Sequence, residues 1–106
     1  MLSYEKIADL LDQTGLPFAY HHFAEGDSPD PPFLVYLTPG SHNFSADGVV
    51  YHRVDQLDIE LYTDKKQPEQ EAQLEAVLDE AGLFYNKTER FIQSEQLYEV
   101  LYEMEV

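Results

Sequence analysis

The segment Leu57–Tyr62, which reads LDIELY, has the most regular alternation of apolar and polar residues in the chain. A period of two is typical of a β-strand that buries one side and exposes the other. We therefore expect the two leucines and Ile59 to face a hydrophobic core, and Asp58, Glu60 and Tyr62 to face away from it. Such a strand needs partners with the same alternation.

The C-terminal quarter supplies a partner of this kind. Residues 84–92 and 97–106 predict a hairpin with its turn at 93–96. In 97–106 the even-numbered positions are aromatic or aliphatic, and three of the odd-numbered positions are glutamates. If this strand and 57–62 lie in one sheet, the uncovered face becomes an acidic plane. The candidate acidic face consists of Asp58, Glu60, Glu99, Glu103 and Glu105.

Two segments have apolar residues at helical spacing, 3–14 and 68–81. Ser3 is a suitable N-cap for the first helix. Gly15 and Gly82 follow the two segments, at the position where a left-handed residue commonly ends a helix. We therefore expect two helices that end at these glycines.

The remaining strands are expected at 18–23, 33–37 and 49–54, with 33–37 in the interior of the sheet. The order of elements is then α-β-β-β-β-α-β-β. Short connections favour antiparallel pairing. We expect a single α+β domain over residues 1–106, with a mostly antiparallel sheet of five to six strands and both helices on one face.

The charge of the chain limits the kinds of partner it can have. Twenty-one acidic residues and six basic residues give a formal net charge of −15. A chain with this charge repels nucleic acid and anionic membranes at long range, so we expect neither sequence-specific nucleic-acid binding nor membrane binding. Three interpretations remain: a solubility feature, a surface for a basic partner, or a surface that lies near DNA without binding it.

The sequence gives little indication of catalysis or metal binding. Residues 18–23 read FAYHHF, and adjacent strand residues project to opposite faces, so His21 and His22 are not expected to share a metal ion. The chain has no cysteine, no metal-binding histidine spacing, no phosphate-binding glycine loop and no nucleophile elbow. We expect a protein that is not an enzyme and that has no metal or cofactor. The following DSPDPP stretch predicts a stiff connector.

Several segments carry a resemblance to a known group of proteins. They read LPFAYHHFAEG, PDPPFLVYL, NFSADGVVYHR, LDIELYTDKK, LDEAGLFY and LYEVLYEMEV, and they cover nearly the whole chain. Together they resemble small prophage proteins of Gram-positive hosts, from the module that builds the head–tail junction. The order of helices and strands is also similar to that of the tail terminator, or head–tail joining, proteins of long-tailed phages.

The resemblance implies a structural role in the virion. It implies a homo-oligomeric ring, which is a hexamer in the family. Whether the subunit is monomeric when isolated is left open by the sequence. It also implies contacts with the tail tube and the head connector, and a location in the host cytoplasm during assembly and then in the tail or neck. The loops 24–32 and 39–48 become candidate inter-subunit contacts through Asp27, Pro29, Pro31, Pro32, His42, Phe44 and Asp47.

A second interpretation of the acidic residues remains open. Carboxylates spaced like DNA phosphates would make the chain a DNA mimic that inhibits a DNA-binding enzyme, with Asp58, Glu60, Glu99 and Glu103 as part of the binding surface. In that case the acidic face attracts a partner, whereas in a ring it repels DNA.

Overall fold

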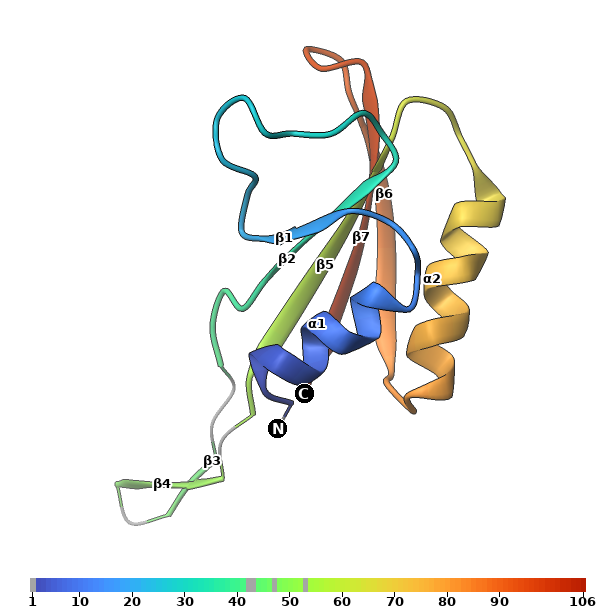
Figure 1. Ribbon diagram of the computed structural model, residues 1–106. Helices are drawn as coiled ribbons and strands as arrows, with labels where there is room; N and C mark the ends of the chain where they lie inside the picture. Colours follow the sequence, from blue (N-terminus) through green and yellow to red (C-terminus); the bar gives the residue numbers. More distant parts are fainter. Residues whose placement is uncertain (1, 42–43, 47, 53) are drawn as a thin grey trace.

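The computed structural model describes residues 2–41, 44–46, 48–52 and 54–106 (Figure 1). Its main sheet has five strands in the order β1-β2-β5-β7-β6. Their bounds are β1 Phe18–Tyr20, β2 Phe33–Leu37, β5 Gln56–Thr63, β6 Tyr85–Ile92 and β7 Leu97–Glu105. The protein is therefore α+β, with the predicted strand 57–62 at the centre of the sheet.

The sheet is mostly antiparallel, as expected, but it is not purely so, because one of its four strand pairs is parallel. β1 pairs with β2 in parallel, while the β2–β5, β5–β7 and β6–β7 pairs are antiparallel. The parallel β1–β2 pair is possible because of the length of the connection between these two strands. Residues 21–32 lie between them, and about a dozen residues suffice for a parallel return.

Both helices begin and end near the predicted residues. In α1, Tyr4–Asp12, the Ser3 side chain accepts a hydrogen bond from the backbone N–H of Lys6 at 3.2 Å. In α2, Pro68–Glu80, the proline occupies the first turn, where its missing N–H costs no hydrogen bond. Gly15 and Gly82 both have φ of +74°, the left-handed conformation predicted for them.

Both helices cover the same face of the sheet. Ile7 and Leu11 of α1 and Leu74 and Leu78 of α2 are buried, and they pack in one cluster with the inward residues of the strands. Those strand residues are Leu34, Tyr36, Leu57, Ile59, Leu61, Val100, Tyr102 and Met104. The alternation in β5 and β7 thus places one apolar side under the helices, as the sequence predicted.

Ion pairs fasten α2 to the edge strand β6. The Glu71 carboxylate is nearly buried and receives the Lys66 ammonium at 2.6 Å and the Lys87 ammonium at 2.8 Å. Lys87 also contacts Glu75 at 2.8 Å, and Lys66 also pairs with Glu89. The two lysines therefore hold carboxylates of the helix and of the strand together.

Two predicted elements differ from the structure. The segment 39–46 was expected to be a loop, but β3, Phe44–Ala46, pairs with β4, Val49–His52. This hairpin forms a sheet of its own and projects away from the main sheet in Figure 1, so β4 does not extend the main sheet as expected. The strand predicted at 18–23 ends at Tyr20, because His21 has φ of +67°, outside the β region.

Candidate functional site

The candidate site is the sheet face opposite the helices, which we call the open face. Its members follow from the register of the strand pairs, because residues opposite one another across a pair share a face. They are Phe33, Val35, Leu37, Gln56, Asp58, Glu60, Tyr62, Asn86, Thr88, Arg90, Ile92, Leu97, Glu99, Leu101, Glu103 and Glu105.

All five candidate acidic residues lie on the open face. Asp58 of β5 lies directly opposite Glu103 of β7, and Glu105 lies opposite Gln56. Among the described residues, no lysine or arginine forms an ion pair with Asp58 or Glu103, and Asp58 accepts a hydrogen bond from Gln56 Nε2 at 3.1 Å. Like charges directly opposite one another destabilise a sheet.

Glu60 and Glu99 form a tighter arrangement around Tyr62. The Tyr62 hydroxyl lies 2.6 Å from Glu60 Oε2 and 2.8 Å from Glu99 Oε2. A phenol has one proton, so it donates to only one of these carboxylates at a time. Arg90 of β6 binds Glu99 with Nε at 3.1 Å and Nη2 at 3.3 Å, and Glu99 is only 5% exposed. The Glu60–Tyr62–Glu99–Arg90 network thus links β5, β7 and β6.

The network moves the pKa values of its two carboxyl groups in opposite directions. Burial raises the pKa of Glu60, the neighbouring Glu99 and Asp58 raise it further, and the hydrogen bond from Tyr62 offsets only part of this. Burial alone would also raise the pKa of Glu99, but Glu60, Arg90 and Tyr62 together favour its charged form, so its pKa is lowered. Glu60 is therefore protonated more readily than Glu99. The negative charge of Glu99 is balanced by the Arg90 guanidinium.

We expect Glu60→Gln to stabilise the protein by about 0.5 kcal/mol at pH 7, because it removes one of several neighbouring negative charges and keeps an acceptor for Tyr62. The folded pKa of Glu60 is raised, so its charge costs stability above that pKa. The gain should therefore vanish below about pH 4.3, the ordinary carboxyl pKa. Urea unfolding at pH 4 and pH 7 measures it. Glu95→Gln, in the exposed β6–β7 turn, is the control for the net charge.

The open face is not bare, in contrast to the sequence-based expectation. Residues 21–32 fold over its β2 end, where the Phe23 ring packs edge-on against Phe33 at 5.4 Å and Phe33 stacks on Tyr62 at 5.2 Å. This explains why Phe33 is buried although the helices cover the other side. The carboxylates of β5 and β7 therefore occupy only part of an open face whose β2 side is apolar.

Three of the four predicted inter-subunit contact residues in the loop 24–32 pack against the rest of their own chain. Asp27 is exposed, whereas Pro29, Pro31 and Pro32 are half-buried. Pro29 and Pro31 line a hollow of about 560 Å³ with Phe33 and Tyr62 and with residues at the β6–β7 turn. Part of the predicted inter-subunit loop thus packs on the open face of its own chain.

We expect Phe23→Ala to release this loop, at a cost of about 1–2 kcal/mol for the lost ring contact and partial burial. Glu25 lies in the loop and is the site at which a glutamate-specific protease would report the release. Cleavage after Glu25 should be faster in the alanine variant than in the unmodified chain. Phe23→Leu keeps an apolar contact and should give an intermediate rate; equal rates for all three would contradict the anchoring role.

The second predicted contact loop is only partly described. Phe44 lies in β3, opposite His52. His42 and Asp47 lie outside the described residues. The backbone of the hairpin projects away from the main sheet, so this segment presents itself to a neighbour more openly than the loop 21–32 does (Figure 1).

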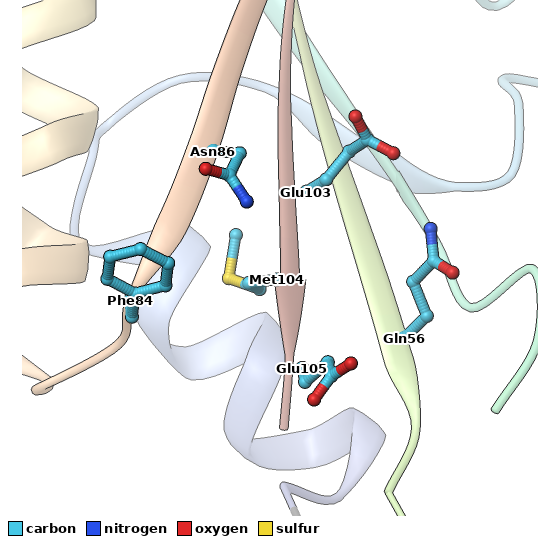
Figure 2. Close-up of a pocket in the computed structure, with 6 residues that line it drawn as sticks. All are labelled: Gln56, Phe84, Asn86, Glu103, Met104 and Glu105. Atoms are coloured by element: carbon cyan, nitrogen blue, oxygen red, sulfur yellow. The ribbon is translucent and has the colours of Figure 1, made fainter. Parts of the chain in front are cut away.

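A hollow of about 590 Å³ lies at the end of the open face where β6 begins and β7 ends. Figure 2 shows its lining, with the Phe84 ring and the Asn86 amide on one side and the carboxylates of Glu103 and Glu105 on the other. The Phe84 side chain is 81% exposed. The hollow thus combines two carboxylates and two amides with one exposed ring and the Met104 side chain.

The expectation that His21 and His22 point to opposite faces is wrong. Because β1 ends at Tyr20, both residues lie in the turn that follows, and their Nδ1 atoms are 3.0 Å apart. One imidazole therefore donates a hydrogen bond to the other. Within the described ranges no cluster of three or more histidine, aspartate or glutamate side chains has the arrangement of a metal site.

Neither Arg90 nor the role of Tyr62 was among the residues predicted from the sequence. A signal for Arg90 was present, because a turn at 93–96 sets Ile92 opposite Leu97 and hence Arg90 opposite Glu99. Comparison of the chain with protein-family models and with curated proteins finds no match. In the described part of the chain, no helix has both the length and the apolar character needed to cross a bilayer.

Proposed function

We propose that this chain is a structural protein of a phage or prophage tail, a tail terminator or head–tail joining protein whose copies assemble into a ring around the DNA channel. The observation that supports this most is the row of carboxylates on the open face. Asp58 and Glu103 face each other across β5 and β7, and Glu60 lies on the same face. A monomer gains no stability from this arrangement.

In a ring, the row of carboxylates on the open face can line the central channel. Carboxylates that line a channel repel DNA phosphates and prevent the counterion release that would hold a passing duplex. The net charge of −15 acts in the same direction. The projecting β3–β4 hairpin is suited to reach a neighbouring subunit or an adjacent ring (Figure 1). The partners in this proposal are further copies of the chain, the tail-tube protein and the head connector.

The test is electron microscopy of the full-length chain, alone and mixed with the tail-tube and connector proteins encoded in the same genome. The expected result is a closed ring with a central opening that admits duplex DNA. No ring under either condition would overturn the proposal.

An Asp58→Lys/Glu103→Lys variant tests the role of the row. It should still assemble, but at low salt its rings should retain DNA that the unmodified rings release, because a repulsive wall has become partly attractive. If the chain instead inhibits a purified DNA-binding enzyme, and this variant loses the inhibition, the DNA-mimic interpretation replaces the ring.

A further inference from the structure

The strand β6 forms an unusually accessible edge of the main sheet. It pairs with β7 on one side only, over eight residues and without a register shift. Residues 86–91 are all exposed, and β6 contains neither proline nor glycine. The opposite edge, β1, has only three residues. Natural sheets usually protect a long edge strand with a proline, a bulge or a covering segment, because its unpaired backbone groups can pair with another chain.

Large apolar rings lie at both ends of this edge. Phe84, just before β6, is 81% exposed, and Phe91 is 47% exposed. Among the described residues, these are two of the four large hydrophobic side chains with the greatest exposure. An exposed ring beside an unpaired strand edge favours a partner that buries both.

We propose that two copies of this chain pair through β6, antiparallel and symmetric about Thr88, so that their two five-stranded sheets become one continuous sheet. In this register residue 84 lies opposite residue 92 of the second copy, residue 85 opposite residue 91, and so on towards Thr88. Odd-numbered residues of β6 face the helices and even-numbered residues face away, and each pair is odd with odd or even with even. Residues on the helix side of one copy therefore meet residues on the helix side of the other. The resulting pairs are Phe84 with Ile92, Tyr85 with Phe91, Asn86 with Arg90, Lys87 with Glu89, and Thr88 with Thr88.

Each of these pairs is chemically favourable or neutral. The ends pair apolar and aromatic side chains, which are among the stabilising cross-strand combinations. Near the centre, Lys87 of each copy lies opposite Glu89 of the other. Within one copy, Lys87 already contacts Glu71 and Glu75, and Glu89 already pairs with Lys66. The intermolecular pairs would therefore extend an existing network on the helix side of the sheet.

Charges on an edge strand normally prevent pairing. Here the register centred on Thr88 places opposite charges across from each other, Lys87 of one copy against Glu89 of the other. A shift of this register by two residues would instead place Lys87 opposite Lys87 or Glu89 opposite Glu89. Two of the six basic residues of the chain, Lys87 and Arg90, lie on β6. This edge is therefore a favourable place for a second acidic copy to approach.

The pairing closes on itself. After two copies meet through β6, the remaining edges of the joined sheet are the two β1 strands, each of three residues. Strands this short are poor templates for further pairing. The expected product is a dimer and not a fibre. The dimer concerns the isolated chain and does not depend on the proposed function, since a ring has to use other surfaces for its head-to-tail contacts.

Single-cysteine cross-linking tests the register, because the chain has no cysteine of its own. In the two-fold register residue 88 meets itself, with Cβ atoms about 4.5–5.5 Å apart, close enough for a disulfide after a small adjustment. The Thr88→Cys variant, equilibrated in a glutathione redox buffer without any tail protein, should give a covalent dimer as its main product on a non-reducing gel.

Matched variants on the same strand and face provide the controls. In an Asn86→Cys or Arg90→Cys homodimer the two thiols are about four residues apart along the strand, roughly 13 Å, and should not cross-link. A mixture of these two variants should cross-link, because residue 86 of one copy lies opposite residue 90 of the other.

Two results would overturn the proposal. One is that Thr88→Cys cross-links no more than Asn86→Cys. The other is that the unmodified chain sediments as a single copy at every concentration in about 0.3 M salt, which screens charge repulsion beyond roughly 5 Å. The two proposals can fail separately. If microscopy finds no rings, the β6 pairing can still be correct, and if β6 does not pair, the chain can still form rings.

Discussion

Replacing Leu61 with alanine is expected to lower the free energy of unfolding by about 2–5 kcal/mol, the range for truncating a buried leucine and leaving a cavity. Leu61 is 0% exposed in the central strand β5, between Leu34 of β2 and Val100 of β7. Its neighbours belong to two other strands and to the cluster under both helices, so they cannot collapse into the space easily. Urea unfolding monitored by circular dichroism measures the loss.

Leu101→Ala is the matched control for this prediction. Leu101 lies on the open face, opposite Glu60, and it is half-buried. Its truncation should cost less than about 1 kcal/mol, because it removes a smaller area from the protein interior. Equal losses for the two leucines would contradict the assignment of the buried and open faces.

Replacing Tyr102 with phenylalanine is expected to cost about 1.5–3 kcal/mol at pH 7, the range for a hydrogen bond to a charged group. The ring of Tyr102 is fully buried, and its hydroxyl donates to Glu75 Oε2 at 2.8 Å, which joins β7 to α2. The change keeps the ring and removes only the donor, so packing should be preserved.

The effect of Tyr102→Phe should depend on pH. Burial disfavours the charge on Glu75, but hydrogen bonds from Lys87 and Tyr102 outweigh this, and the pKa of Glu75 is lowered. A carboxylate with a lowered folded pKa stabilises the protein above its unfolded pKa, about 4.3, and this stability is lost as the pH falls through the folded pKa. The difference between Tyr102→Phe and the unmodified chain should therefore be largest near pH 7 and shrink towards pH 3.

Tyr98→Phe is the control for the loss of a hydroxyl on the same strand and the same side. Tyr98 is half-buried and packs against Phe91 with ring centroids 4.9 Å apart. Its substitution should change the free energy of unfolding by less than about 0.5 kcal/mol. A loss for Tyr98→Phe as large as that for Tyr102→Phe would mean that the bond to Glu75 is not the cause.

For the apolar segment FLVYL, residues 33–37, the sequence predicted the strand but not what covers its second side. Its continuous apolar character predicted an interior strand, and β2 is one, next to the central β5. The same feature also implied that both sides of the strand are covered. One side lies under the helices, and the other is covered by the loop that carries Phe23, a residue that the sequence pattern had placed in a strand.

The sequence by itself determined the faces of β5 and β7, because a period of two assigns each side chain to one side of a sheet whatever the strand pairs with. That is why each of the five candidate carboxylates could be assigned to the polar side of its own strand from the sequence. It likewise determined the helix ends, since a capping serine and left-handed glycines act over a few residues.

Only the tertiary structure decided which strands are neighbours and which charges are compensated. The parallel β1–β2 pair, the separate β3–β4 hairpin, and the Arg90–Glu99 and Tyr62–Glu60 contacts all depend on the return path of the chain or on the register across strands. Local patterns act within a few residues of each position. They do not specify contacts between residues far apart in the sequence, because those depend on how the whole chain fills its core.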